Sequence, residues 1–150
     1  MADAAEVRVR AARWPQDTAA LRMLRRRVFI EEQSVPETLE WDGRDAECHH
    51  AIAELVDGTP LGTGRLLPAG ADGRAQIGRM AVLPEYRNRG IGRRLLLVLL
   101  DAAQARGDAA VHLHAQLDAM TFYTREGFVA EGDIFVEAGI EHRSMCLSLD

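Results

Sequence analysis

Two glycines flanked by arginines lie between a strand-like and a helix-like segment, and their spacing suits the binding of a pyrophosphate. They belong to the segment Arg87-Asn88-Arg89-Gly90-Ile91-Gly92. The first N–H groups of a helix have no intrahelical acceptor, and the helix dipole favours an anion at that end. Glycine has no Cβ to block a close approach, and Arg93 and Arg94 add further positive charge. The segment therefore predicts a phosphate-binding loop, with a simple turn as the alternative.

The spacing excludes two common phosphate loops. No lysine follows the second glycine, as a P-loop requires, and a dinucleotide-binding turn needs a third glycine. The residues fit R-x-x-G-x-G instead, with Arg87, Gly90 and Gly92 at the fixed positions. The stretch from Pro84 to Gly92 resembles the acetyl-CoA loop of the GCN5-related N-acetyltransferases (GNAT family).

Other segments extend this resemblance from about Arg13 to the C-terminus. The segments 122–128 and 61–66 resemble the late F-Y-x-x-x-G-F motif and the central G-x-x-R-L strand of the family. Several further segments resemble the small bacterial ElaA/YjcF-like branch, namely 28–33, Val35-Pro36, Trp41-Asp42, Ala115-Gln116 and 139–142. Glu141 stands where the branch usually has a proline.

The resemblance implies an acyl-CoA-dependent N-acyltransferase. It would transfer acetyl from acetyl-CoA to a primary amine of a small molecule or peptide by direct attack, with acetyl-CoA as co-substrate and no metal. In such enzymes the backbone of the strand before the loop binds the pantetheine arm. The implied cofactor-binding residues are Met80, Val82, Arg87, Asn88, Arg89, Gly90, Ile91, Gly92 and Arg93.

Tyr123 is the candidate for stabilising the leaving thiolate. A phenol has a pKa near 10 and is neutral at pH 7, whereas a free thiol titrates near 8.5. Tyr123 can thus donate a hydrogen bond to the thiolate, although full proton transfer is slightly uphill. The alternative is a core tyrosine packed beside Phe122.

Three residues are candidates for the base that takes the amine proton: Glu32, Glu137 and His142. A glutamate whose pKa is raised by burial, or an ordinary histidine, can do this directly or through water. Glu32 can equally form a salt bridge at a helix end, Glu137 can lie on a turn and His142 can be a hydrogen-bonded strand residue. We retain Glu32 and His142, with Tyr123, as the predicted catalytic residues. His49-His50 has no third ligand at metal spacing, so no metal site is expected.

Bulk properties restrict the class of protein. The 150 residues, 47% hydrophobic and 27% charged, predict one globular domain over residues 1–150. A net charge of −5 argues against nucleic-acid binding. The N-terminus resembles no signal peptide, no apolar run spans a membrane, and Cys48 and Cys146 read as free thiols. We expect a cytoplasmic protein without membrane contact, and leave open whether it forms a homodimer.

The pattern of elements predicts a mixed α/β fold. Apolar periodicity and turn signals place strands at 7–10, 48–56, 61–67, 76–83, 109–115, 129–136 and 143–149. Helices are expected after an N-cap at Asp17, over 91–105 and from Asp118 to Glu126. The first buries Leu21, Leu24 and Val28, with Arg22, Arg25, Arg26 and Arg27 on its solvated face; the second buries Ile91, Leu95, Val98 and Ala102. This order suits a GNAT-like, mostly antiparallel sheet of about seven strands with helices on both faces.

The main alternative function is a regulatory module that binds acetyl-CoA without catalysis, and Tyr123 argues against it. Another kind of nucleotide-binding domain lacks its motifs, and an interaction domain would use the arginines between 22 and 27. Acids at Glu31, Glu32, Glu37, Glu40 and Asp42 either attract a cationic amine or only make a loop soluble. We expect the segments 31–42 and 137–142 to face one cleft.

Overall fold

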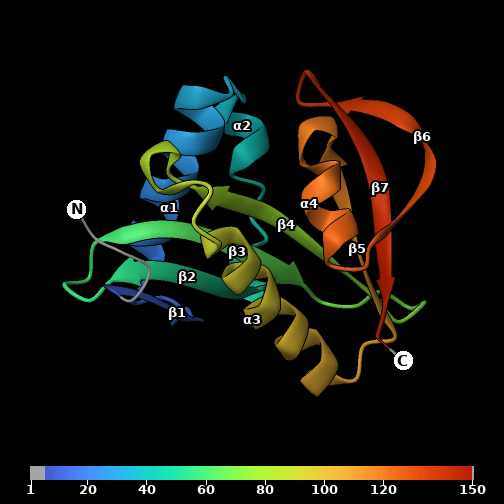
Figure 1. Cartoon of the computed structure of the whole chain (residues 1–150), viewed down its shortest axis with the longest axis horizontal. Helices are drawn as coiled ribbons and strands as arrows, with labels where there is room; N and C mark the ends of the chain where they lie inside the picture. The colour runs from blue at the N-terminus through green and yellow to red at the C-terminus, as the bar shows by residue number, and fades with distance from the viewer. Residues whose placement is uncertain (1–5, 150) are drawn as a thin grey trace.

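A computed structural model describes residues 6–149 (Figure 1). Its elements in chain order are β1 (Val7–Ala11), α1 (Thr18–Arg25), the π-helix η2 (Arg26–Glu32), α2 (Glu37–Glu40), η3 (Asp45–Glu47), β2 (His49–Leu55), β3 (Pro60–Leu67), β4 (Arg74–Val82), η4 (Pro84–Tyr86), α3 (Ile91–Arg106), β5 (Ala110–Gln116), η5 (Leu117–Ala119), α4 (Met120–Arg125), β6 (Val129–Glu137) and β7 (Ile140–Ser148).

The strands form one seven-stranded sheet in the order β1-β2-β3-β4-β5-β7-β6. Every neighbouring pair is antiparallel except β4 and β5, which are parallel and are joined through α3. The predicted mixed, mostly antiparallel sheet is therefore confirmed.

The sheet opens at the parallel pair. β4 and β5 are in register only from Arg74↔Ala110 to Ile77↔Leu113, although both strands continue beyond these residues. A bulge in β4 accompanies the divergence, because the register with β3 gains one residue between Gly78 and Ala81. Bulges bend a strand and redirect its side chains. The sheet thus splits where the chain approaches the glycine loop.

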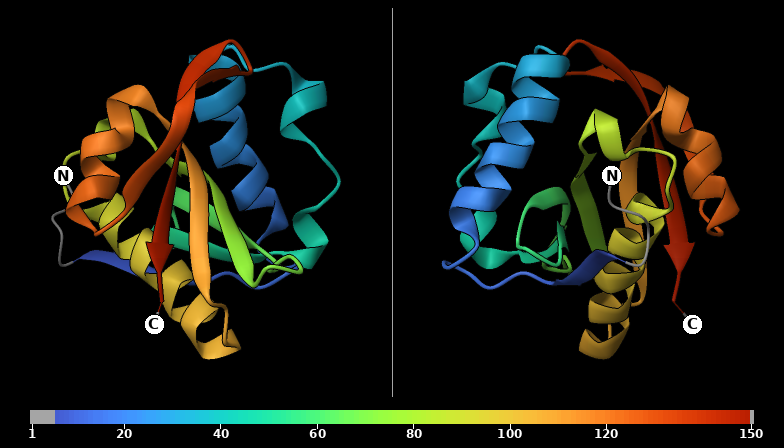
Figure 2. Two further views of the ribbon diagram at one scale, coloured as in Figure 1. Left: turned by 90° about the vertical axis from the view of Figure 1, so that its right-hand side faces the viewer. Right: turned by 60° about the vertical axis from the view of Figure 1, so that its left-hand side comes forward.

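Helices cover both faces of the sheet, as expected. Figure 2 shows α1 and α2 on one face and α3 and α4 on the other. The larger apolar core lies under α3, where Leu95, Leu96 and Leu99 are buried. The predicted face of α3 was rotated, since Val98 and Ala102 are only partly buried. These two residues lie at the margin of the helix contact.

α1 confirms its predicted apolar face and corrects its predicted polar one. Leu21, Leu24 and Val28 are buried. Arg25 was expected in solvent but is only 1% exposed, because it forms ion pairs inside the protein. Asp17 is at the N-cap position without a capping hydrogen bond; its carboxylate binds Arg10 instead, with Nη1–Oδ2 at 2.9 Å.

The end of α4 follows the prediction and positions Tyr123. Gly127 has φ 97°, and the N–H of Phe128 donates to the Tyr123 carbonyl at 3.1 Å. This is the hydrogen-bonded stop that a glycine after a helix provides. Asp118 does not cap the helix, because it lies in the 3₁₀ turn η5 and makes no capping bond.

Two smaller expectations can be compared with the structure. Cys48 and Cys146 are free thiols, as predicted. Within residues 6–149, none of the helices combines the length and the apolar character needed to cross a membrane.

Candidate active site

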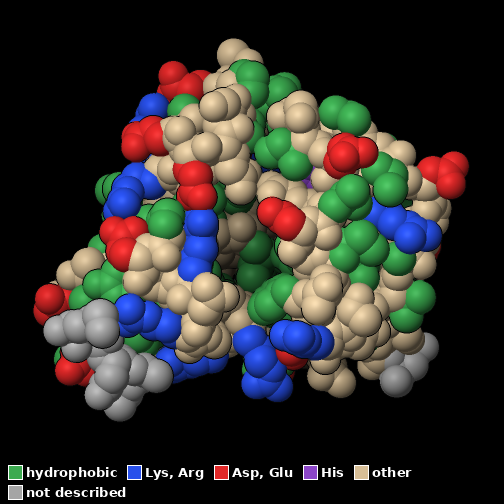
Figure 3. All heavy atoms as spheres, turned by 45° about the horizontal axis from the view of Figure 1, so that its top comes forward, with side chains coloured by type: hydrophobic (Ala, Val, Ile, Leu, Met, Phe, Trp, Pro, Cys, Tyr) green, Lys and Arg blue, Asp and Glu red, His purple; other side chains and the backbone are tan. Residues whose placement is uncertain are grey.

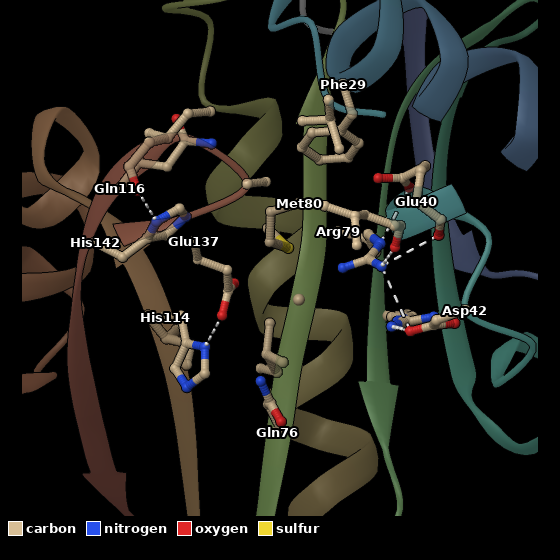
Figure 4. Close-up of a pocket in the computed structure, with 18 of the residues that line it drawn as sticks. Phe29, Glu40, Asp42, Gln76, Arg79, Met80, His114, Gln116, Glu137 and His142 are labelled. Atoms are coloured by element: carbon tan, nitrogen blue, oxygen red, sulfur yellow. Dashed lines mark hydrogen bonds and ion pairs between the residues drawn. The ribbon is translucent and has the colours of Figure 1, made fainter. Parts of the chain in front are cut away.

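A cleft of about 450 Å³ occupies the place where β4 and β5 diverge (Figure 4). One wall comes from η2, α2 and the segment after it, including Phe29, Glu40 and Asp42. The other comes from β5 and the β6–β7 hairpin, including Glu137 and His142. The segments 31–42 and 137–142 therefore contribute to one cleft, as expected. Figure 3 shows a hollow in the surface between α4 and the loop that precedes α3, with charged side chains around the opening.

The glycine loop has the predicted form of a strand, a turn and a helix start. α3 begins at Ile91, directly after Gly90, whose φ of 78° is left-handed. No neighbour lies within 4 Å of a Cβ built on Gly90, so its backbone conformation, not crowding, calls for glycine. No acceptor for the N–H groups of residues 90–93 is found within residues 6–149. These amides remain available to an anion at the helix N-terminus.

Arg87 links the glycine loop to β4 and to η2. Its Nε donates to the Val82 carbonyl at 2.9 Å, and its two terminal nitrogens each lie 2.7 Å from the Glu32 carboxylate. Hydrogen bonds from Arg87 hold the pKa of Glu32 below its usual value. A carboxylate with a lowered pKa is a weak proton acceptor, and Glu32 does not line the cleft. The structure therefore argues against Glu32 as the base.

Two further arginines of the loop region contact neighbouring side chains. Arg93 pairs with Glu126 of the segment after α4, with Nε–Oε1 at 3.1 Å. The guanidinium of Arg89 lies over the ring of Tyr86, 5.3 Å from its centroid. Asn88 has a left-handed φ of 63°. Of the two β4 residues expected to offer backbone groups, Met80 lines the cleft and Val82 is paired through its carbonyl with Arg87.

Tyr123 lines the cleft and is 8% exposed. Its ring packs edge-on against Phe122 and Phe128, which fixes its direction. Within residues 6–149 its hydroxyl makes no hydrogen bond. Burial raises the pKa of Tyr123 to about 12, so the phenol stays neutral and able to donate at physiological pH.

His142 is held through one ring nitrogen and presents the other to the cleft. Its Nδ1 lies 2.7 Å from the Ile140 carbonyl, which requires a proton on Nδ1 and leaves the Nε2 lone pair free. The ring stacks on Phe135, with centroids 5.8 Å apart, and is 7% exposed. It reaches the cleft from β7, beside Gln116 of β5.

Glu137, the third candidate base, pairs with a residue that the sequence reasoning missed. Its Oε2 lies 3.0 Å from Nδ1 of His114 on β5, and both residues line the cleft. The alternation of His112, His114 and Gln116 along an otherwise apolar strand could have revealed this polar face. The pairing of β6 with β7 places the carboxylate side chain of Glu137 on the cleft wall.

A buried charge network supports the opposite wall. Arg25 binds Glu40 at 2.7 Å and Asp45 at 2.6 Å, and Arg65 also binds Asp45, at 2.9 Å, and Asp42. Glu40 and Asp42 are thus compensated by arginines, which argues against their attracting a cationic amine. Arg79, which the sequence reasoning also missed, reaches the same wall from the bulge of β4.

One amide pair joins the two walls. Gln116 of β5 donates through Nε2 to Oε1 of Gln33 at 2.9 Å. The residues are far apart in sequence and both line the cleft. Among residues 6–149 no group of three or more His, Cys, Asp or Glu side chains is placed to hold a metal ion.

Comparison with known sequences places the chain in a family. The sequence profile of the acetyltransferase (GNAT) family matches residues 10–128. The chain belongs to the acetyltransferase (GNAT) family. It is accordingly an N-acetyltransferase that uses acyl-CoA.

Individual relatives agree with the ElaA/YjcF-like branch. The chain is 35% identical over 124 residues to YjcF of Bacillus subtilis, an uncharacterized N-acetyltransferase, covering 81% of this chain and 86% of that protein. A solved acyl-CoA N-acyltransferase from Pseudomonas aeruginosa is 33% identical with a TM-score of 0.80, covering 93% and 97% of the two chains. The structure of ElaA from Escherichia coli is 25% identical, also with a TM-score of 0.80, and covers 94% and 97%.

Proposed function

We propose that this enzyme transfers acetyl from acetyl-CoA to a primary amine of a small molecule or peptide by direct attack. The observation that carries the proposal is that Tyr123 and His142 line one cleft, at the point where β4 and β5 part. Acyl-CoA supplies the thioester; the chain supplies groups that hold it and move protons.

The free amides of residues 90–93 at the start of α3, together with the backbone of Met80 and Val82, would hold the cofactor. The fit rests on three features: the left-handed Gly90, the helix amides that have no acceptor among residues 6–149, and the split beside β4. Arg87 contributes by keeping the loop in shape through Val82 and Glu32. Loop side chains such as Arg89 and Arg93 would add charge near the phosphates.

Two side chains would share the proton transfers. His142 accepts a proton from the attacking amine at Nε2 while the nitrogen bonds to the thioester carbonyl carbon. Tyr123 donates a hydrogen bond to the sulfur as the C–S bond breaks. With a pKa of about 12, Tyr123 stabilises the thiolate without protonating it.

The test is an acetyl-CoA assay against a panel of primary amines, with the released thiol as the readout. His142→Ala should reduce turnover about 100-fold or more, in the range of a lost general base, and added imidazole should partly restore it. His112→Ala is the matched control, because His112 lies on the same face of β5 as His114 but does not line the cleft.

Full turnover in His142→Ala would exclude His142 as the base and would leave Glu137 or water to take the amine proton. Thiol release without amine dependence would indicate hydrolysis alone and would contradict the proposed transfer. Binding of acetyl-CoA with no turnover of any amine would favour the regulatory alternative.

A further inference from the structure

Arg79 occupies a strained position whose effect is to turn its side chain into the cleft. It lies in the bulge of β4 and has a φ of 54°, a left-handed conformation that non-glycine residues seldom adopt. Such strain persists only where the surrounding structure enforces it, and it concentrates at functional sites. Figure 4 shows Arg79 extending from β4 toward Glu40 and Asp42.

The guanidinium of Arg79 is only partly used by the protein. Its Nη2 donates to the carbonyls of Leu39 and Glu40, at 3.2 and 3.1 Å. Its Nε lies 3.1 Å from Glu40 Oε2 but outside hydrogen-bonding geometry. Its Nη1 makes no hydrogen bond within residues 6–149. In Figure 4 one guanidinium nitrogen is turned away from Glu40 and Asp42 toward the open middle of the cleft.

The neighbouring carboxylates already have other partners. Glu40 is bound by Arg25, and Asp42 by Arg65, so the acids near Arg79 are shared among several arginines. Burial lowers the pKa of Arg79, and repulsion from Arg65 and Arg25 opposes the attraction of Glu40 and Asp42. A further anion at Nη1 would replace the water that this cation has lost.

The facing wall carries proton acceptors. Glu137 and His114 form a pair at 3.0 Å, and His142 presents its free Nε2 from the next strand. The cleft therefore has a cation with free donors on one wall and groups suited to an amine on the other. Its volume of about 450 Å³ is that of a small-molecule site.

We infer, building on the proposed acetyl transfer, that the acceptor is an amino-carboxylate compound, such as an amino acid or short peptide, whose carboxylate binds Arg79. A guanidinium recognises a carboxylate through paired N–H donors, and such charge-assisted bonds are stronger than neutral ones. The acceptor amine would then lie on the side of Glu137 and His142.

The test compares acceptors that differ only at the carboxylate. Each of several amino acids is assayed beside its carboxamide and its decarboxylated amine, with acetyl-CoA saturating. The wild-type kcat/KM should be about 10- to 100-fold higher for the carboxylate, the range expected for hydrogen bonds to a charged group. Most of the difference should lie in KM, because the carboxylate contributes to binding and takes no part in making or breaking bonds.

Arg79→Gln should bring this ratio close to one. The ratio is measured within each variant, so partial misfolding does not affect it, and an acetyl-CoA thermal shift confirms the folded fraction. Arg44→Gln is the matched control: Arg44 also lines the cleft, but its Nε is bound to Glu47 at 2.6 Å. Arg44→Gln should keep the wild-type ratio, and Arg79→Lys should retain part of it.

Equal kcat/KM for carboxylate and decarboxylated acceptors would overturn the assignment, as would an unchanged ratio in Arg79→Gln. A preference for phosphate-bearing amines over carboxylate-bearing amines would overturn the carboxylate assignment and would indicate that Arg79 binds a phosphate. A second readout is the thermal shift given by the amino acids in the presence of CoA. A thermal shift that depends on Arg79, without turnover, would count against the proposed acetyl transfer only. If the amino acids give no thermal shift that depends on Arg79, the proposed role of Arg79 is overturned.

Discussion

At the scale of single residues, the groups suited to chemistry are those without a hydrogen-bond partner among residues 6–149. The hydroxyl of Tyr123 and Nε2 of His142 both lie on the cleft, and each is fixed by aromatic contacts rather than by a bond to the reactive atom. Glu32 is the opposite case, since Arg87 engages both of its oxygens. Availability of an atom, rather than residue type alone, separates these candidates.

Tyr123→Phe should reduce kcat roughly 10- to 10,000-fold, the span for one oriented donor. The hydroxyl has no partner within residues 6–149, so its removal should leave the melting temperature and acetyl-CoA affinity almost unchanged. Steady-state kinetics and thermal unfolding of the same preparation check both statements. Wild-type kcat in this variant would make Tyr123 a packing residue only.

At the scale of elements, α3 is flanked at each end by a glycine in the left-handed conformation. Gly90 precedes it with φ 78° and Gly107 follows it with φ 87°, and neither has a neighbour within 4 Å of a built Cβ. The two positions therefore impose the same backbone demand on any substituted residue. Only the Gly90 end has the free amides of a helix N-terminus.

Gly90→Val and Gly107→Val should each lower the free energy of unfolding by about 1–2 kcal/mol, the cost of a left-handed conformation for an L-residue. Acetyl-CoA should raise the melting temperature of Gly107→Val as in the wild type. The same ligand should fail to do so for Gly90→Val. Thermal shifts with and without acetyl-CoA measure this, and equal shifts in both variants would exclude the loop from cofactor binding.

At the scale of the whole molecule, partly buried ion pairs join separate elements of the fold. Asp17, at the start of α1, is bound by Arg10 of β1, and Asp42 is bound by Arg65 of β3. Hydrogen bonds from Arg10 and Arg65 hold the pKa values of Asp17 and Asp42 well below the usual range. Both pairs connect the first helical segments to the sheet and so keep one wall of the cleft in place.

These pairs predict instability in acid. The pKa of each carboxylate is lower in the folded state than in the unfolded state, where it is near 3.9 for Asp. Each carboxylate therefore stabilises the fold fully above pH 3.9, and this stabilisation is lost as the pH falls through the folded pKa. Urea unfolding should therefore show a loss of about 1 kcal/mol per carboxylate between pH 6 and pH 2, since solvent screens pairs that are only partly buried. Asp42→Asn should be less stable at pH 6 and lose less on acidification; parallel pH profiles would contradict this role of Asp42.

Local pattern was enough to predict the elements and the form of the glycine loop. Alternation and turn signals gave the seven strands within a few residues, and the spacing of Arg87, Gly90 and Gly92 gave the family. These features depend on neighbours a few residues away, so a linear pattern records them. The same reasoning placed Tyr123 one turn before Gly127, where the structure has it.

Only the tertiary structure decided which polar groups meet. Arg25 looked solvent-exposed by its helical position, yet acids from α2 and η3 bury it. Glu32 was a candidate base from its sequence, but in the structure Arg87 of the loop binds its carboxylate. Arg79 lies in a bulge of β4, which the apolar periodicity of the sequence does not reveal. Contacts of this kind join residues that are distant in sequence. The chain alone therefore predicted the loop that we propose holds the cofactor, whereas the packing of one sheet against α1 and α2 decided which side chains line the cleft.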